Sequence, residues 1–453
     1  MSSSATSSAD TNVSTIVAPA TTLGRGAIAI ARLSGPEALR IALKTLRRET
    51  LTPRYAHLLY LYDANNEPID RAIVVYFNAP KSYTGEDIVE FQTHGGEAAI
   101  NALMETLTAY GAVLARSGEF SLRAVKNGKM ALDEAEAAAA YAAARAAKAA
   151  NLLAKHLRGD LARFTEDLRS RLVRLIAYAE TAIDYAEEDL GDTKAAMRDQ
   201  LDDLERTLRE AVAASLKRKS LLRGFEIAII GKPNAGKSSL LNALLGESRS
   251  IVSDQPGTTR DLVGEELRIG EHIVRVLDTA GLREGGNEIE TIGIEYAKRA
   301  AEKADFIVAL FDGSQPFDKN DEAVLEFIRD KEALAAINKR DLEQKIDLSR
   351  FDGFERLFIS AKNDVAPLLN YLRSTLDRQI GGEETTLVSE RQIALVSSAA
   401  ASAAQAREHL EGGELELFSY RVQEAIGFVG AITRPADYGE TLDAMFSEFC
   451  LGK

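Results

Sequence analysis

The chain has 453 residues, of which 45% are hydrophobic and 27% charged, and its formal net charge is −14. This length predicts about two to four domains, and no run approaches the roughly 18 apolar residues that a membrane-spanning helix needs. The acidic charge excludes a surface broadly covered with nucleic-acid-binding cations, and the single cysteine, Cys450, excludes an internal disulfide framework and is typical of a reducing cytoplasm. The first basic residue is Arg25, which predicts neither a signal peptide nor an Arg-rich transit peptide.

Residues 1–125 are expected to form an α+β domain, because short β-rich runs alternate there with helical patterns. The helices are predicted at Pro36–Leu46 and Glu97–Gly111. The strands are predicted at Thr15–Ala18, Ala27–Leu33, His57–Tyr62 and Arg71–Phe77.

From Ala131 onwards the composition favours helices. Alanine, the strongest helix former, dominates Ala131–Ala150. Apolar residues at three- and four-residue spacing then continue through Asn151–Glu188 and Thr193–Lys219, which predicts long packed helices. We assign residues 126–222 to the first part of a helical domain.

A different pattern interrupts the helices. Residues 223–380 alternate apolar strand candidates with helices, which is typical of an open α/β sheet. Helical patterns return at Ser389–Glu411 and Leu415–Val429, after a Gly-rich linker. We therefore predict a multidomain protein in which an α/β domain, 223–380, is inserted between two parts of one helical domain, the second part being 381–453.

The inserted domain begins with a phosphate-binding pattern. Gly231-Lys-Pro-Asn-Ala-Gly236-Lys237-Ser238 directly follows the apolar run Phe225–Ile230. The glycines let successive N–H groups turn towards one phosphate chain. Lys237 supplies a charge for the terminal phosphates, and the Ser238 hydroxyl can bind magnesium. The pattern predicts a nucleoside triphosphate site.

Two later motifs indicate that the base is guanine. Asn338-Lys-Arg-Asp341 closes the strand candidate Leu334–Ile337, and the Asp341 carboxylate can accept from two adjacent N–H groups of guanine. Adenine presents a mismatched edge, and an unpaired polar group of this kind discriminates by about 10⁴-fold. Ser360-Ala-Lys362 follows another apolar strand and strengthens the prediction.

Two further strings complete the nucleotide site. Asp278-Thr-Ala-Gly281 follows the apolar strand Ile273–Leu277, where Asp278 can bind magnesium through water and Gly281 can approach the γ-phosphate. Within Gly257-Thr-Thr-Arg260, Thr259 is expected to give magnesium its second hydroxyl. The motifs together predict these nucleotide contacts: Asn234, Ala235, Gly236, Lys237, Ser238, Ser239, Gly257, Thr258, Thr259, Asp278, Thr279, Ala280, Gly281, Asn338, Lys339, Asp341, Ser360, Ala361 and Lys362.

The expected water-orienting glutamine is missing. Ras-like GTPases carry Gln directly after this glycine, but this chain carries Leu282. Glu290 is a candidate for that role, although a solvated carboxylate at a helix start is an alternative. No arginine finger stands out, and Asn234 could instead help to hold a monovalent cation near the β–γ bridge.

The order of these parts resembles the MnmE (TrmE) family of tRNA-modification GTPases over nearly the whole chain from Ile16. The family's marks in this sequence are Gly24-Arg-Gly26, Ala31-Arg-Leu-Ser-Gly35, Tyr83-Thr-Gly-Glu-Asp87, Glu90-Phe-Gln-Thr-His-Gly-Gly96, Gly118-Glu-Phe-Ser-Leu-Arg-Ala124, Asn127-Gly-Lys129, Ile183-Asp-Tyr-Ala-Glu-Glu-Asp189 and Cys450-Leu-Gly-Lys453. The resemblance implies that the inserted domain is a Ras-like GTPase domain.

The resemblance also implies a second site. Members of the family dimerise through the N-terminal domain, which binds a tetrahydrofolate derivative, in the 5,10-methylene or 5-formyl form, as a one-carbon donor. The matching positions are Arg32, Glu90, Lys129 and Lys453. Cations there can hold the carboxylates of the folate's glutamate tail. Cys450 is a candidate nucleophile beside this site, with an inert tail thiol as the alternative.

For the GTPase domain the resemblance implies potassium, with Glu290 orienting water. The potassium positions are Asn234, Ser253, Gln255 and Thr258, and Asp254 and Pro256 join the predicted nucleotide contacts. Lys237, Glu290 and Cys450 are the predicted catalytic residues. The implied partner is an FAD-binding MnmG (GidA) protein, with which the family forms 5-carboxymethylaminomethyl or 5-aminomethyl wobble uridine in certain tRNAs.

Two other functions share the nucleotide motifs. A ribosome-assembly GTPase would act as a nucleotide-switched binding module, and we would expect it to carry a Lys/Arg-rich RNA-binding appendage, which the sequence does not show. A nucleotide-gated scaffold without one-carbon chemistry is the third interpretation. Binding of folate would separate both from the family's function.

Overall fold

The computed structural model describes residues 14–22, 24, 26–144, 146–184, 191–247, 264–277, 302–380, 385–434 and 445–446. Its contacts divide the chain into two compact units, each built from separate stretches of sequence. The first comprises Met1–Ala139, Gly159–Leu204 and Ser398–Lys453, and the second comprises Ala140–Arg158 and Glu205–Ser397. The domain limits predicted at 125, 222 and 380 stay predictions.

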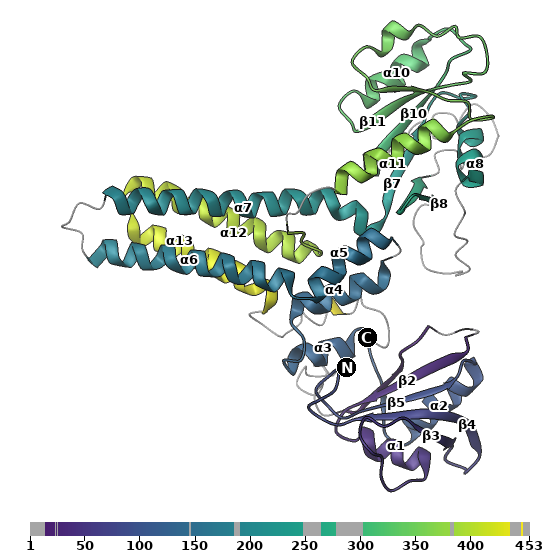
Figure 1. Cartoon of the computed structure of the whole chain (residues 1–453), viewed down its shortest axis with the longest axis vertical. Coiled ribbons are helices and arrows are strands. Elements are labelled where there is room, and N and C mark those ends of the chain that lie inside the picture. Colours follow the sequence, from purple (N-terminus) through teal and green to yellow (C-terminus); the bar gives the residue numbers. More distant parts are fainter. Residues whose placement is uncertain are drawn as a thin grey trace, which may run out of the picture. The chain divides into compact units, whose positions relative to one another are not determined.

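An α+β domain opens the first unit (Figure 1). Its six strands are β1 (Ile16–Pro19), β2 (Ile28–Ser34), β3 (His57–Tyr62), β4 (Pro68–Phe77), β5 (Ile88–His94) and β6 (Val113–Leu114). They form one sheet in the order β3-β4-β5-β2-β1-β6, antiparallel except where β1 pairs with β6. The sequence patterns missed β5 and β6.

Helices cover one face of this sheet. Strand side chains alternate between faces, and the inward set, including Leu33, Val74 and Phe91, packs with Ile41 of α1 (Ala38–Leu46) and Leu103 of α2 (Glu97–Ala109). All five are fully buried. The opposite face presents exposed apolar side chains, namely Ile28, Leu58, Tyr60 and Ile73.

The helical part contains more helices than the patterns predicted. They are α3 (Glu119–Lys126), α4 (Leu132–Ala143), α5 (Ala147–Leu157), α6 (Asp160–Asp184), α7 (Gly191–Arg223), α12 (Glu390–Gly412) and α13 (Leu415–Thr433). Helices α4 to α6 are shorter than predicted, whereas α7 and α13 are longer. The Ala-rich run therefore belongs to two helices, since α4 ends at Ala143. The stretch predicted from Asn151 to Glu188 is also divided, because Gly159 adopts φ +81°, outside the helical region.

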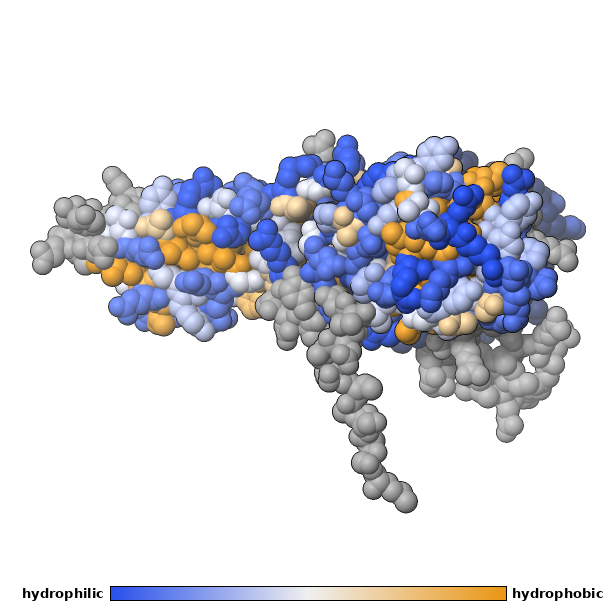
Figure 2. Space-filling model, turned by 90° about the horizontal axis from the view of Figure 1, so that it is seen from below, coloured by the Kyte–Doolittle hydropathy of each residue, from blue (hydrophilic) through white to orange (hydrophobic). Residues whose placement is uncertain are grey.

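Helices α6 and α13 lie side by side in the first unit (Figure 1). Leu168, Leu172 and Leu175 of α6 and Phe418 and Val422 of α13 are fully buried at helical spacing. Apolar residues also reach the surface of this pair, as Figure 2 shows; Leu417 is 48% exposed. No helix among the described residues is long and apolar enough to cross a membrane.

The second unit contains a doubly wound α/β domain. The strands are β7 (Phe225–Ile230), β8 (Gly264–Ile269), β9 (His272–Leu277), β10 (Phe306–Asp312), β11 (Ala333–Asn338) and β12 (Arg356–Phe358), in the order β12-β11-β10-β7-β9-β8. Only β8, within the described residues, runs antiparallel to its neighbour.

Helices cover both faces of this second sheet. One core joins the sheet to α8 (Lys237–Glu247) and α11 (Ala366–Ile380), and another joins it to α10 (Lys319–Ile328). A buried parallel sheet binds ligands at the carboxyl ends of its strands, which is where the loops after β7 and β11 lie. The predicted fold class, an α+β domain with helices and an inserted Ras-like α/β domain, is confirmed.

The packing of α13 predicts how substitutions on its two faces affect the free energy of unfolding. Phe418→Ala deletes a fully buried ring and should lower the free energy of unfolding of the first unit by about 3–5 kcal/mol, because it leaves a cavity. Leu417→Ala, at the exposed neighbouring position, should change it by about 0.5 kcal/mol or less. Urea unfolding followed by circular dichroism measures both. Equal effects of the two substitutions would contradict the assigned helix face.

Candidate functional site

The phosphate loop connects β7 to α8 and depends on close backbone approaches. A Cβ atom on Gly231 would lie 2.4 Å from the Leu310 carbonyl oxygen of β10, so only glycine fits. Gly236 has φ +103°, and a Cβ there would lie 2.4 Å from the Asn338 side chain. Both glycines of the predicted motif are therefore required by the fold itself.

Lys237 lies at the start of α8 with its ammonium turned back over the loop. Its Nζ donates to the carbonyl oxygens of Gly231 at 2.9 Å and Lys232 at 3.0 Å. Burial lowers the pKa of Lys237 from its ordinary value. Ser238 and Ser239 follow in the first turn and are exposed, so the Ser238 hydroxyl is accessible to a ligand.

Asn338 joins three loops into one site. Its Nδ2 donates to the Ala235 carbonyl oxygen of the phosphate loop at 2.8 Å, and its Oδ1 accepts from the Ala361 N–H at 2.8 Å. The side chain is buried, and both its donor and its acceptor function are used. The predicted phosphate and base segments therefore meet at the end of β11.

The carboxylate predicted to read the base lies beside this junction. Ser360 Oγ donates to Asp341 Oδ1 at 2.6 Å, and this hydrogen bond holds the pKa of the Asp341 carboxyl below its usual value. Asp341 is exposed, so it stays ionised and can accept N–H donors from a bound base. Lys339 Nζ donates to Asp312 Oδ2 at 2.6 Å. Lys362 is exposed.

One anchor of the phosphate loop, Lys232, was not predicted from the sequence. Lys232 Nζ lies 2.7 Å from Asp321 Oδ2 and 3.0 Å from Asp318 Oδ2, at the N-terminus of α10. Although burial lowers it, the hydrogen bonds from Lys232 to these two carboxylates raise the pKa of Lys232 overall. The Asp318-x-x-Asp321 capping box was the available signal, but it predicts a helix start rather than a tether.

Three of the four predicted folate residues, Arg32, Glu90 and Lys129, lie in the described part of the N-terminal domain. Arg32 Nε of β2 lies 2.9 Å from Glu90 Oε1 of β5. The Arg32 guanidinium also lies 5.3 Å from the Tyr83 ring centroid and 5.7 Å from that of Phe120, two aromatic residues whose role the patterns missed. Lys129 is exposed beyond α3, where its side chain runs past Gly85.

The remaining predicted residues lie outside the described part of the chain. They are Ser253, Asp254, Gln255, Pro256, Gly257, Thr258, Thr259, Asp278, Thr279, Ala280, Gly281, Glu290, Cys450 and Lys453. Their assignments stay predictions.

A mostly parallel sheet with a phosphate loop after β7 and the Asn338–Asp341 motif after β11 is the arrangement of a P-loop guanine-nucleotide-binding protein. The family description "GTP-binding protein TrmE N-terminus" matches residues 15–129, and "MnmE helical domain" matches residues 132–450. The chain is 48% identical to the tRNA modification GTPase MnmE of a Sulfurovum species, over 97% of this chain and 98% of that one. It is 49% identical to the MnmE of a Nitratiruptor species, over 98% and 99%. The chain belongs to the MnmE family of tRNA modification GTPases and is thus a GTP hydrolase by family.

Among solved structures, a variant of Aquifex aeolicus Era bound to GDP and AlF4− is 30% identical over 39% of this chain and 66% of that one, with a TM-score of 0.27. So low a score leaves the fold assignment to the strand order and the loop geometry.

The base-reading role predicted for Asp341 can be tested through nucleotide specificity. Asp341→Asn replaces one acceptor by an amide donor, so GTP affinity should fall by about 10⁴-fold while xanthosine triphosphate, which carries a carbonyl in place of the guanine amino group, gains affinity. Competition against a fluorescent GDP measures both. Asp347→Asn is the matched control, because Asp347 likewise accepts from a serine hydroxyl, that of Ser349 at 2.8 Å, away from the site. Unchanged GTP affinity would remove Asp341 from the site.

Proposed function

We propose that this chain hydrolyses GTP while forming 5-carboxymethylaminomethyl or 5-aminomethyl groups on the wobble uridine of certain tRNAs. The observation that carries the nucleotide part is the junction at Asn338, which holds the phosphate loop next to the base-reading segments. Family membership over nearly the whole chain supports the tRNA part. In the hydrolysis step, water attacks the γ-phosphorus, a new P–O bond forms, and the bond to the β–γ bridging oxygen breaks to give GDP and phosphate.

Lys237 and magnesium would share the triphosphate. The described residues contain no cluster of three or more His, Cys, Asp or Glu that could hold a metal, while the Ser238 hydroxyl is exposed at the loop. This donor set fits an ion held largely by the nucleotide's own phosphates. Ser238 and Thr259 would be its protein ligands, and magnesium would supply positive charge to the β- and γ-oxygens. Lys237 would exchange its loop carbonyl partners for phosphate oxygens.

A monovalent cation would take the place of an arginine finger. Asn234 fits this role because it adopts φ +64° and is exposed at the turn of the loop, so its side-chain oxygen is accessible to a ligand. Ser253, Gln255 and Thr258 would complete the potassium site, and potassium would add positive charge near the β–γ bridge. Glu290 would orient the attacking water.

The N-terminal domain would bind the reduced folate that donates the one-carbon unit. The Arg32–Glu90 pair beside the half-buried Tyr83 ring fits such a ligand, because a planar pterin can stack on an accessible ring while charged groups bind its polar ends. The fully buried Phe120 ring lies against the Arg32 guanidinium from the core side. Lys129 and Lys453 would bind the tail carboxylates, and Cys450 is proposed as a nearby nucleophile. Replacement of Cys450 by Ser without loss of tRNA modification would refute that last role.

The proposed assembly is a homodimer that works in the cytoplasm with an FAD-binding MnmG (GidA) type partner. The exposed apolar face of the N-terminal sheet supports contact between copies of this domain. The net charge of −14 supports a division of labour in which the partner supplies most of the tRNA-binding cations.

Cation dependence tests the hydrolytic part. GTP turnover should be about tenfold or more faster in potassium than in sodium at equal ionic strength, because only the fitting cation offsets the developing charge. Glu290→Ala should lower kcat about 100-fold in potassium, and Glu288→Ala, two residues earlier, should leave kcat nearly unchanged. The proposal fails if turnover is the same in both salts, or if the two substitutions act alike.

A further inference from the structure

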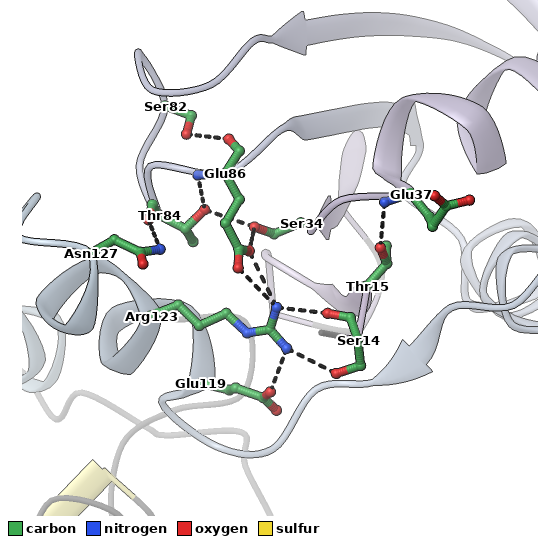
Figure 3. A network of polar contacts seen from close by, with 10 residues as sticks. All are labelled: Ser14, Thr15, Ser34, Glu37, Ser82, Thr84, Glu86, Glu119, Arg123 and Asn127. Carbon is green, nitrogen blue, oxygen red and sulfur yellow. Dashed lines mark hydrogen bonds and ion pairs between the residues drawn. The ribbon is translucent and has the colours of Figure 1, made fainter. Parts of the chain in front are cut away.

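A buried polar network lies at the join between the N-terminal sheet and α3 (Figure 3). The Arg123 side chain is only 2% exposed. Its Nη1 donates to the Ser14 carbonyl oxygen at 2.7 Å and to both carboxylate oxygens of Glu86 at 3.2 Å. Its Nη2 donates to Glu119 Oε1 at 2.9 Å. One guanidinium thus holds three separate chain segments together.

The same network fixes the loop between β4 and β5 at several points. Ser34 Oγ donates to Glu86 Oε2 at 2.8 Å and lies 2.7 Å from Thr84 Oγ1. Asn127 Nδ2, at the end of α3, donates to the Thr84 carbonyl oxygen at 2.7 Å. Figure 3 shows these side chains converging on the loop from the β2 end and from α3. The loop is therefore held on both sides, and charged bonds of this kind are costly to break when buried.

Tyr83 and Gly85, which flank Thr84 in this loop, lie against two cationic side chains proposed for the folate site, Arg32 and Lys129. The Tyr83 ring lies under the Arg32 guanidinium, and its hydroxyl is hydrogen-bonded to Ser121 of α3 at 2.8 Å. Gly85 has φ +81°, and a Cβ atom there would lie 2.9 Å from Lys129 Cγ. The position of this one loop therefore sets the space that both Arg32 and Lys129 can occupy.

We propose that Arg123 and Glu86 are positioning residues for the folate site: they hold the loop at 82–87 so that Tyr83 orients Arg32 and Gly85 leaves room for Lys129. This inference rests on the proposed folate function. Neither Arg123 nor Glu86 needs to touch the ligand. Their effect is preorganisation, since two long cationic side chains that are already oriented lose less freedom when they bind carboxylates.

Gly85 offers the sharpest test, because a methyl group at this position would displace the Lys129 side chain. In a titration of the full chain with 5-formyltetrahydrofolate, Lys129→Met should weaken binding by about tenfold through loss of a charge-assisted contact. Gly85→Ala should weaken it to a similar extent. The double variant should bind about as weakly as either single variant, because both changes remove the same contact. Gly111→Ala is the matched control, since Gly111 also has positive φ (+109°) but open space around its Cβ position.

Two conservative substitutions test the network itself, one that keeps the charge of the side chain and one that keeps its shape. Arg123→Lys and Glu86→Gln should each weaken folate binding by about tenfold while GTP affinity stays at the wild-type value. Arg40→Lys, at an exposed ion pair with Glu37, should change neither. Circular dichroism of the full chain shows whether each variant is folded, and Gly85→Ala keeps the inference testable if Arg123→Lys is not.

The outcomes separate this inference from the function on which it rests. If wild-type protein does not bind the folate, the folate proposal fails and this inference fails with it. If wild type binds but Gly85→Ala matches Gly111→Ala, or if the losses from Gly85→Ala and Lys129→Met are additive, the positioning role is wrong and the folate site stands.

Discussion

The Asn338 side chain links the described segments of the nucleotide site. Its amide donates to the phosphate loop and accepts from the segment at Ala361, and both hydrogen bonds are buried. Gly236 must lack a Cβ because that amide occupies the space. A buried amide that loses one partner leaves a polar group unsatisfied, which costs about 1–3 kcal/mol. We therefore expect the loops to stay together or to separate together, and we expect recognition of phosphate and of base to be coupled.

The N-terminal domain uses the same kind of constraint with charges. Arg123 joins the chain at Ser14, the loop at Glu86 and the helix at Glu119, as Asn338 joins its three loops. In both cases a buried polar side chain, together with the apolar packing around it, holds segments that carry predicted ligand-binding residues. Apolar cores tolerate exchange of shape, whereas a hydrogen-bond network accepts few alternatives. Sites built in this way are preorganised in the free protein.

Local chemistry determined what the sequence could predict. The phosphate loop, the Asn338–Asp341 motif and the inserted α/β domain were predictable because glycine spacing and apolar runs act over a few residues. The ion pair between Lys232 and Asp321 was not predictable, because the two residues are 89 positions apart in the sequence. Each of them is also of a residue type that is usually found on the surface. Strand β6, with two residues, is too short for any period to show. The helix break at Gly159 was visible as a glycine, but apolar residues at three- and four-residue spacing continue on both sides of it and hid it.

Hydrogen–deuterium exchange of the full chain tests the central claim most directly, namely that phosphate and guanine recognition are coupled through Asn338. The segments to follow are 231–239, 338–341 and 360–362, with saturating GDP or ADP. Coupling through Asn338 predicts that GDP slows exchange in all three segments together, and that ADP, which lacks the guanine edge, leaves all three close to the rate of the free protein. Protection of 231–239 alone by either nucleotide, with 338–341 and 360–362 unchanged, would contradict it.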